Sequence, residues 1–167
     1  MRILICEDSV LLREGLVRLL EDAGHSVVAA LADTDGLSEA VIETDPELCI
    51  LDVRLPPTFT DEGIRAALEL RVTHPALPLL VLSQYVEERY ASDLISAQGG
   101  PLGYLLKDRV ADVSEFLASV QRISEGATVL DPEVVAQLLT RRNRDDRMQR
   151  LTERCLLYTS DAADEGL

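Results

Sequence analysis

The chain has 167 residues, of which 47% are hydrophobic and 28% are charged. This length suits one domain with at most a short appendage, and it is enough to bury a core without disulfide or metal staples. Sixteen basic and thirty acidic residues give a formal net charge of −14, which excludes nucleic-acid binding through bulk charge because phosphate contacts need clustered cations. No apolar run reaches the roughly 18 residues of a membrane span, so we expect a cytoplasmic protein with no membrane contact.

Five short apolar runs, rich in Val, Ile and Leu, recur along the chain. Runs without polar interruption favour strands of a parallel sheet that is covered on both faces. The segments between them have apolar residues at helical spacing, and the first has Ser9 as expected N-cap and Gly24 as expected stop. Strand and helix alternate five times before Gly126, which predicts βαβ units in a doubly wound parallel sheet. The five runs are residues 3–6, 27–31, 48–51, 79–82 and 104–106.

A further helix is predicted after Gly126. Asp131 and Pro132 form a strong start signal, an N-cap followed by proline at the first helical position. Apolar residues then share one face as far as Leu139, whereas residues 141–147 are charged and lack apolar periodicity. We therefore expect a linker helix within residues 127–150, with an exposed, charged end.

Polar side chains stand at the ends of four of the predicted strands. Glu7 and Asp8 follow the first, Asp52 the third, Ser83 the fourth and Lys107 the fifth. Any one of them alone is more often a turn or cap residue than a functional group. If the strands have the flavodoxin-like order, however, all five converge on the edge where open parallel sheets bind ligands.

This combination of side chains has a specific chemistry. Packed carboxylates repel one another unless a cation neutralises them, and a hard divalent ion with oxygen ligands, above all Mg²⁺, is the natural occupant. A carboxylate beside Mg²⁺, with a lysine and a hydroxyl at hand, is suited to accept a phosphoryl group.

Four segments, ILICEDS, CILDVRLPP, LVLSQY and GYLLKD, together resemble the receiver domain of two-component response regulators. The resemblance covers residues 1–126 and implies a flavodoxin-like, doubly wound five-stranded parallel sheet. By this resemblance, Asp52 is the phosphoacceptor and a sensor histidine kinase is the donor. Glu7, Asp8, Asp52 and the backbone carbonyl of Arg54 would hold Mg²⁺.

The resemblance also assigns three residues to phosphoryl binding and signal transmission. Lys107 would pair with the phosphoryl group, Ser83 would be the switch hydroxyl, and Tyr104 would take the place of the switch aromatic. For Tyr104, a half-buried strand aromatic without any switching role is an equally good interpretation. A homodimer that forms on phosphorylation is a further implication.

The sequence LLKD at 105–108 and the helix from Asp131 resemble the NarL/FixJ branch, whose members bind DNA through a LuxR-type helix-turn-helix. Residues 151–154 are similar to the start of such a domain, which implies control of transcription. Residues 155–167 instead resemble the read-through translation of a sequencing adapter. We expect an artefactual tail after a truncation, so that DNA is bound only through the missing C-terminal domain.

Two rival functions remain open. A haloacid-dehalogenase-like phosphohydrolase also uses Asp, Mg²⁺, Ser or Thr and Lys, but its nucleophile follows the first strand with a second acid two residues on, where this chain has Val10. The second rival is an interaction module that works without phosphorylation. Such modules commonly lack one of the five strand-end side chains, all of which are present in this chain. Gln84, where the family has a small residue, puts the rate of phosphorylation in question. We expect the protein to catalyse its own phosphorylation and dephosphorylation and no other reaction.

Overall fold

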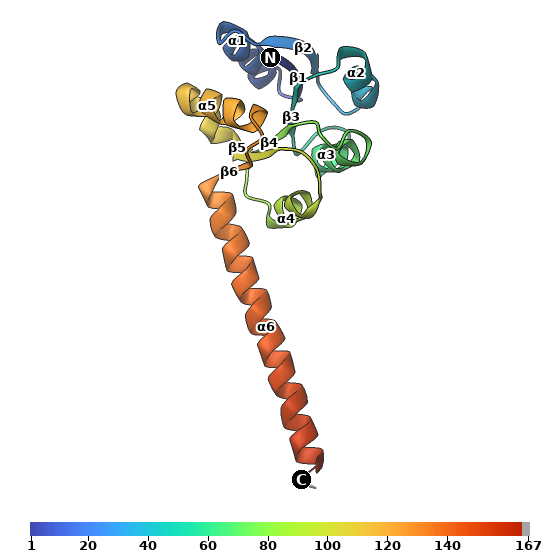
Figure 1. The fold of residues 1–167 in the computed structure, drawn as a ribbon, viewed down its shortest axis with the longest axis vertical. Helices are drawn as coiled ribbons and strands as arrows, with labels where there is room; N and C mark the ends of the chain where they lie inside the picture. The colour runs from blue at the N-terminus through green and yellow to red at the C-terminus, as the bar shows by residue number, and fades with distance from the viewer. Residues whose placement is uncertain (165–167) are drawn as a thin grey trace.

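A central sheet of six parallel strands carries the fold, with helices on both faces (Figure 1). The computed structural model describes the backbone of residues 1–164 and the side chains of residues 1–144 and 146–151. The strand order is β2-β1-β3-β4-β5-β6, so the first five strands have the flavodoxin-like order. The strands are β1 (Arg2–Cys6), β2 (Ser26–Leu31), β3 (Leu48–Asp52), β4 (Leu79–Ser83), β5 (Leu102–Leu106) and β6 (Val129–Leu130).

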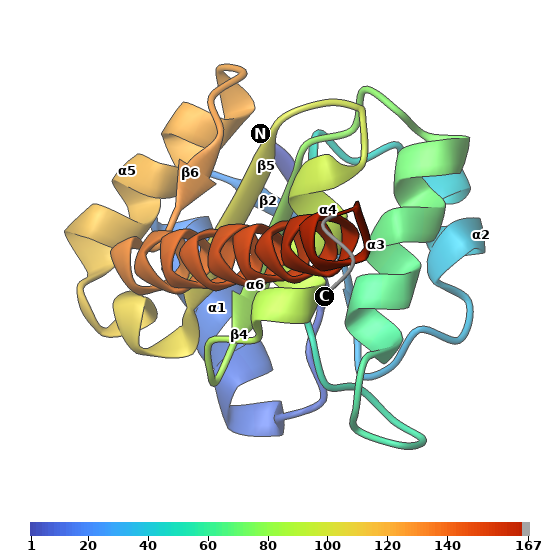
Figure 2. The same cartoon turned by 90° about the horizontal axis from the view of Figure 1, so that it is seen from below.

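The helices form two layers around the sheet. Helices α1 and α5 cover one face, whereas α2, α3 and α4 cover the other (Figure 2). A 3-10 helix, η1, follows β5 directly. The helices are α1 (Val10–Asp22), α2 (Leu37–Thr44), α3 (Glu62–Thr73), α4 (Glu88–Ser96), η1 (Lys107–Ala111), α5 (Val113–Ser124) and α6 (Pro132–Asp164).

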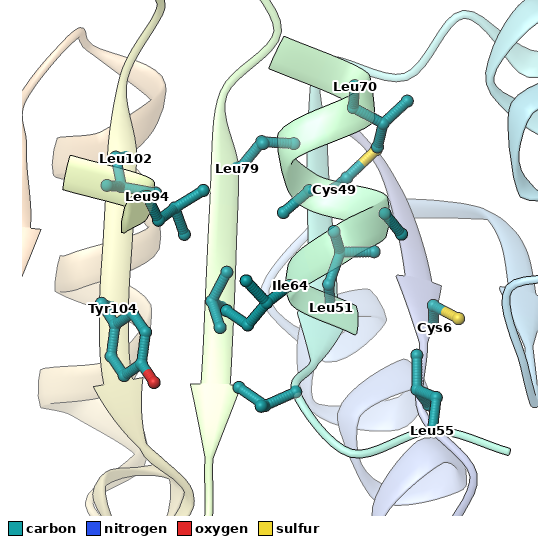
Figure 3. Close-up of a cluster of buried hydrophobic side chains, with 14 of the residues drawn as sticks. Cys6, Cys49, Leu51, Leu55, Ile64, Leu70, Leu79, Leu94, Leu102 and Tyr104 are labelled. Carbon is teal, nitrogen blue, oxygen red and sulfur yellow. The ribbon is translucent and has the colours of Figure 1, made fainter. Parts of the chain in front are cut away.

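The central strands are apolar on both sides because each side packs against helices. In β1, Ile3 and Ile5 join the cluster that contains the buried residues of α1 and α5. Leu4 and Cys6 alternate with them and join the opposite cluster, part of which Figure 3 shows. Fully burying a large aliphatic side chain stabilises the fold by about 1.5–3 kcal/mol. This two-sided burial explains the uninterrupted apolar runs of the sequence.

The five predicted strands and the intervening helices are confirmed. Ser9 caps α1 as expected, its hydroxyl accepting from the Leu12 N–H at 3.4 Å, and Gly24 follows the helix with φ +92°. The sixth strand, β6, was not predicted, because two residues carry no periodicity. It pairs Val129 and Leu130 with Gly103 and Tyr104 of β5 and so extends the sheet.

Helix α6 leaves the sheet directly after β6 and projects away from the other elements (Figure 1). Its first turns pack on the rest of the fold, with Val134 buried and Leu138 partly buried in the cluster that includes α4. The helix continues through residues 151–154 to Asp164, so its backbone has no break where a new domain was predicted to begin. Residues 165–167 of the predicted artefactual tail lie outside the described residues. None of the described helices combines the length and apolar character needed to cross a membrane.

Asp131 fastens α6 to the sheet. Its fully buried carboxylate accepts two hydrogen bonds from Arg109, at 2.8 and 3.0 Å, and one each from the N–H groups of Leu106 and Glu133. Burial alone would raise the pKa of Asp131, but Arg109 and the two N–H groups outweigh it and lower the pKa. The N-cap predicted from the sequence is therefore also the ion-pair partner of Arg109 in η1 and the acceptor of the Leu106 N–H, and these contacts join α6 to the end of β5.

We expect Asp131→Ala to lower the free energy of unfolding by about 2–3 kcal/mol, since it removes the N-cap and leaves the N–H groups of Leu106 and Glu133 without their acceptor. Asp112→Ala is the matched control, because Asp112 caps α5 through a hydrogen bond to the Glu115 N–H without a buried ion pair; it should cost only about 1 kcal/mol. Urea unfolding at pH 7 measures both.

The pH dependence has a definite sign. A carboxyl group with a lowered folded-state pKa stabilises the fold above its unfolded pKa of about 4, and this contribution is lost as the pH falls toward the folded value. The stability difference between wild type and Asp131→Asn should therefore shrink below about pH 4. A difference that stays constant down to the acid transition would contradict the ion-pair interpretation.

Candidate functional site at the carboxyl edge of the sheet

The carboxyl ends of β1, β3, β4 and β5 bring the predicted side chains to one edge of the sheet. Because β3 lies between β1 and β4, Asp52 at its end stands in the middle of this edge. Ser83 ends β4 and is paired with Leu106, the last residue of β5, after which Lys107 follows at once. Open parallel sheets bind ligands at this edge.

Lys107 contacts two of the acids directly. Its Nζ lies 3.0 Å from Asp52 Oδ2 and 3.2 Å from Glu7 Oε1. Asp52 is 4% exposed and Glu7 is 1% exposed, so the attraction is screened less than it would be at the surface. These two ion pairs hold the ends of β1, β3 and β5 together.

Glu7, Asp8 and Asp52 form a candidate magnesium site. One carboxylate oxygen of each lies within 4.8 Å of the others, and Glu7 Oε2 is buried without a hydrogen-bond partner among the described residues. A single lysine does not neutralise three carboxylates, so the cluster favours an additional cation. A donor set made only of carboxylate oxygens fits Mg²⁺.

The acids and the lysine shift each other's titration. Burial raises the pKa of Asp52 to about 7, Glu7 acts in the same direction, and Lys107 opposes both. Burial lowers the pKa of Lys107, but Asp52 and Glu7 outweigh it, so that the pKa is raised. Lys107 therefore keeps its charge at neutral pH, and a cation among the acids would favour the ionised form of Asp52.

The turn that carries Glu7 and Asp8 is braced by a residue that sequence reasoning missed. Arg13, in the first turns of α1, donates to the backbone carbonyls of Glu7 at 2.8 Å and Asp8 at 3.4 Å. The Ser9 N–H donates to Glu7 Oε1 at 3.2 Å. A basic residue one turn into a helix that follows an acidic loop was the available signal.

The loop after Asp52 is held by Glu62 at the start of α3. Its carboxylate accepts from the Thr58 N–H at 2.6 Å, the Thr58 hydroxyl at 2.7 Å and the Thr60 N–H at 3.2 Å. Burial alone would raise the pKa of Glu62, but these bonds lower it to about 2. The loop after Asp52 is thereby fixed by one ionised side chain.

Gly63 lets α3 approach the end of β3. Its N–H donates to the Val53 carbonyl at 2.9 Å. A Cβ at this position would lie 1.6 Å from the carbonyl oxygen of Asp52. Only glycine fits, and no sequence signal distinguished Gly63 from a loop glycine.

Ser83 and Tyr104 lie beside the acidic cluster without a hydrogen bond to it. The Ser83 hydroxyl donates to the Tyr85 carbonyl at 2.5 Å. Tyr104 is fully buried rather than half-buried, and it belongs to the apolar cluster on the α4 side of the sheet (Figure 3). Burial raises the pKa of Tyr104 to about 12; the Ser83 hydroxyl is near enough to oppose this, yet the Tyr104 hydroxyl has no hydrogen-bond partner of good geometry among the described residues.

Arg54 has a side-chain contact that the sequence did not indicate. The backbone N–H of Arg54 donates to Asp52 Oδ1 at 3.3 Å. The backbone carbonyl of Arg54 is the group that was predicted as a metal ligand. The guanidinium group of Arg54 pairs with Glu87 in the loop before α4. Gln84, in the same loop, is exposed.

The site combines a buried aspartate at the middle strand end with a lysine and two further acids. This arrangement is typical of one class of signalling domain. The family model described as the response regulator receiver domain matches residues 3–121, and the chain belongs to this family, which is not a family of classical enzymes. The flavodoxin-like fold and the resemblance found in the sequence are thereby confirmed.

Within the family, the similar proteins include transcriptional regulators and LuxR-family response regulators. The transcriptional regulatory protein LnrK of Bacillus subtilis (strain 168) is 28% identical over 153 residues, which are 91% of this chain and 66% of that protein. A nitrate/nitrite response regulator protein homolog of Haemophilus influenzae is 32% identical over 160 residues, 92% of this chain and 71% of that protein. The chain thus spans about two thirds of the length of these relatives.

The solved structures agree. A LuxR-family two-component response regulator from Aurantimonas sp. SI85-9A1 superposes with a TM-score of 0.72 at 27% identity, covering 84% of this chain and 96% of that one. The predicted branch is therefore supported by sequence and by structure.

We expect Gly63→Ala to lower the free energy of unfolding by about 3 kcal/mol, because the added methyl group meets backbone that cannot rotate away. Gly15→Ala is the control: Gly15 lies in α1 with nothing within 4 Å of a Cβ, and the change should add about 0.5–1 kcal/mol. Urea unfolding of both variants is the measurement, and a Gly63→Ala midpoint equal to that of wild type would show the close approach to be unimportant.

Proposed function

We propose that the chain accepts a phosphoryl group on Asp52 from a sensor histidine kinase, and that this controls transcription through a DNA-binding effector domain. The observation that carries the proposal is Lys107 bridging Asp52 and Glu7 within a cluster of three carboxylates. Membership of the receiver family supports it.

The reaction forms one bond and breaks one. A carboxylate oxygen of Asp52 attacks the phosphorus of a phosphohistidine, the P–N bond breaks, and its electron pair stays on the imidazole, which is protonated at its other nitrogen. Burial keeps Asp52 away from bulk water, and Lys107 already stands where negative charge collects on the transferred group. Ser83 turns from the Tyr85 carbonyl to donate to a phosphoryl oxygen.

Mg²⁺ would be held by Glu7, Asp8, Asp52 and the backbone carbonyl of Arg54. When bound, it supplies charge compensation for the phosphoryl oxygens as they pass between donor and acceptor. The unpartnered Glu7 Oε2 supports this assignment. Glu7 also accepts from Lys107 and from the Ser9 N–H, so it positions the lysine whether or not it binds the metal directly.

The phosphoryl group is later lost to water, which attacks the phosphorus and releases inorganic phosphate and free Asp52. The chain thereby catalyses its own modification and demodification without turning over a separate substrate. In this proposal the protein acts in the cytoplasm, the ring of Tyr104 serves as the switch aromatic, and phosphorylated copies pair as homodimers.

Acetyl phosphate with Mg²⁺ should add one phosphoryl group to the wild-type chain, measured by intact mass. We expect Asp52→Asn to abolish the modification, because an amide oxygen does not form the acyl phosphate. Asp22→Asn is the control, since Asp22 is exposed at the end of α1 away from the acidic cluster. Modification that persists in Asp52→Asn would overturn the assignment, and steady turnover of a phosphate ester would favour a phosphohydrolase instead.

Lys107→Met should slow this phosphorylation by about a hundredfold, the usual effect of removing one preorganised donor from a charged transition state. Methionine keeps most of the side-chain volume but removes the charge. The rate of modification at fixed acetyl phosphate and Mg²⁺ is the measurement. An unchanged rate would show that Lys107 holds the strand ends together without assisting the transfer.

A further inference from the structure

Arg54 links the loop after Asp52 to the loop before α4. Its Nε lies 2.9 Å and its Nη2 2.5 Å from Oε1 of Glu87. The guanidinium group also stands over the ring of Tyr85, 5.7 Å from the ring centre. The Arg54 side chain is half-exposed, whereas the Glu87 side chain is only 12% exposed, so the pair is screened less than a fully exposed one.

Arg54 balances the charge of Glu87. Among the side chains that the structure describes, Arg54 is the ion-pair partner of Glu87, and the second oxygen, Oε2, is buried without a hydrogen bond. The nearby Tyr104 hydroxyl is likewise buried and unpartnered. A buried carboxylate oxygen without a partner is costly, so withdrawal of Arg54 would leave Glu87 poorly compensated in its present place.

The backbone of Arg54 is already bound to the acceptor. Its N–H donates to Asp52 Oδ1, which keeps the guanidinium group within side-chain reach of anything attached to Asp52. A phosphoryl group brings up to two negative charges and three acceptor oxygens, whereas Glu87 offers Arg54 a single oxygen. Guanidinium groups bind phosphate oxygens with two parallel hydrogen bonds, so the phosphoryl group competes well for Arg54.

Two interactions link the segment between Ser83 and α4 to the site. In each of them the donor, a hydroxyl or a guanidinium group, could instead bind a phosphoryl oxygen. One is the bond from the Ser83 hydroxyl to the Tyr85 carbonyl. The other is the Arg54–Glu87 pair. Glu87 directly precedes α4. The first residue of α4, Glu88, accepts hydrogen bonds from Arg144 of α6 on both carboxylate oxygens, each at 3.3 Å. Movement of Glu87 therefore acts on the helix against which α6 packs.

We propose, building on the proposed function, that Arg54 exchanges partners, from Glu87 in the unmodified protein to the phosphoryl group on Asp52, and that loss of the Arg54–Glu87 pair frees the start of α4 to change its packing against α6. Arg54 is thus a positioning residue for the output of the site, acting through Glu87. Its side-chain role is separate from any role of its carbonyl in holding Mg²⁺.

A double-mutant cycle tests this exchange in the full chain. Arg54→Gln, Glu87→Gln and the double variant are compared with wild type by urea unfolding, with and without beryllofluoride and Mg²⁺ as the phosphoryl mimic. We expect a favourable coupling between the two residues without the mimic and no coupling with it, because the mimic then holds Arg54. Equal coupling in both conditions would overturn the exchange.

Hydrogen exchange supplies a readout that a merely structural pair would not give. In wild type, beryllofluoride should speed amide exchange in residues 84–96 several-fold. Glu87→Gln should show that faster exchange already without the mimic, whereas Glu88→Gln, which leaves Arg54–Glu87 intact, should keep the wild-type response in residues 84–87. No effect of Glu87→Gln on these amides would overturn the proposal.

The two proposals fail in distinguishable ways. If wild type takes up neither beryllofluoride nor a phosphoryl group, the proposed function fails and the exchange falls with it. If wild type is modified on Asp52 but its coupling and its α4 exchange do not change, the proposed function stands and only the partner exchange is wrong. Arg54→Lys sharpens the second case, since it keeps the charge but loses the fork geometry and should retain only part of the coupling.

Discussion

The ammonium group of Lys107, placed between Asp52 and Glu7, is the interaction on which the rest of the molecule depends. Three buried or half-buried carboxylates at one sheet edge repel one another, and a fold that buried them without compensation would be unstable. The lysine provides part of that compensation from a third strand end. The remaining negative charge favours an additional cation, and the proposed phosphoryl transfer would rely on that cation.

The elements around this cluster divide into a rigid and an adjustable part. The turn before α1 and the loop before α3 are held by Arg13 and Glu62, through bonds that do not involve Asp52. The segment from Ser83 to Glu87, by contrast, is tied through groups that lie beside the acceptor. In the proposed function, a charge added at Asp52 would act on the segment before α4, whereas Arg13 and Glu62 anchor the other two loops through bonds of their own.

Apolar runs were enough to predict a doubly wound parallel sheet, since two-sided burial and parallel topology leave few alternatives. The flavodoxin-like strand order, which puts the strand-end polar residues at one edge, came from the family resemblance. These signals were not enough for the features that depend on close packing. Nothing local shows that Gly63 touches the carbonyl of Asp52 or that Arg54 reaches Glu87, 33 residues away. The two-residue β6 was missed for the same reason: it is defined by its partner strand and not by a pattern of its own.

Because α6 is long, a small rotation at its base would produce a large displacement at its far end. At about 1.5 Å per residue, its 33 residues extend about 50 Å. Val134 and Leu138, in its first turns, pack in the core that includes α4. A tilt of about 10° at that base would carry Asp164 sideways by about 9 Å, given the helical rise. The helix would act as a lever that pivots about its attachment at the Asp131–Arg109 ion pair.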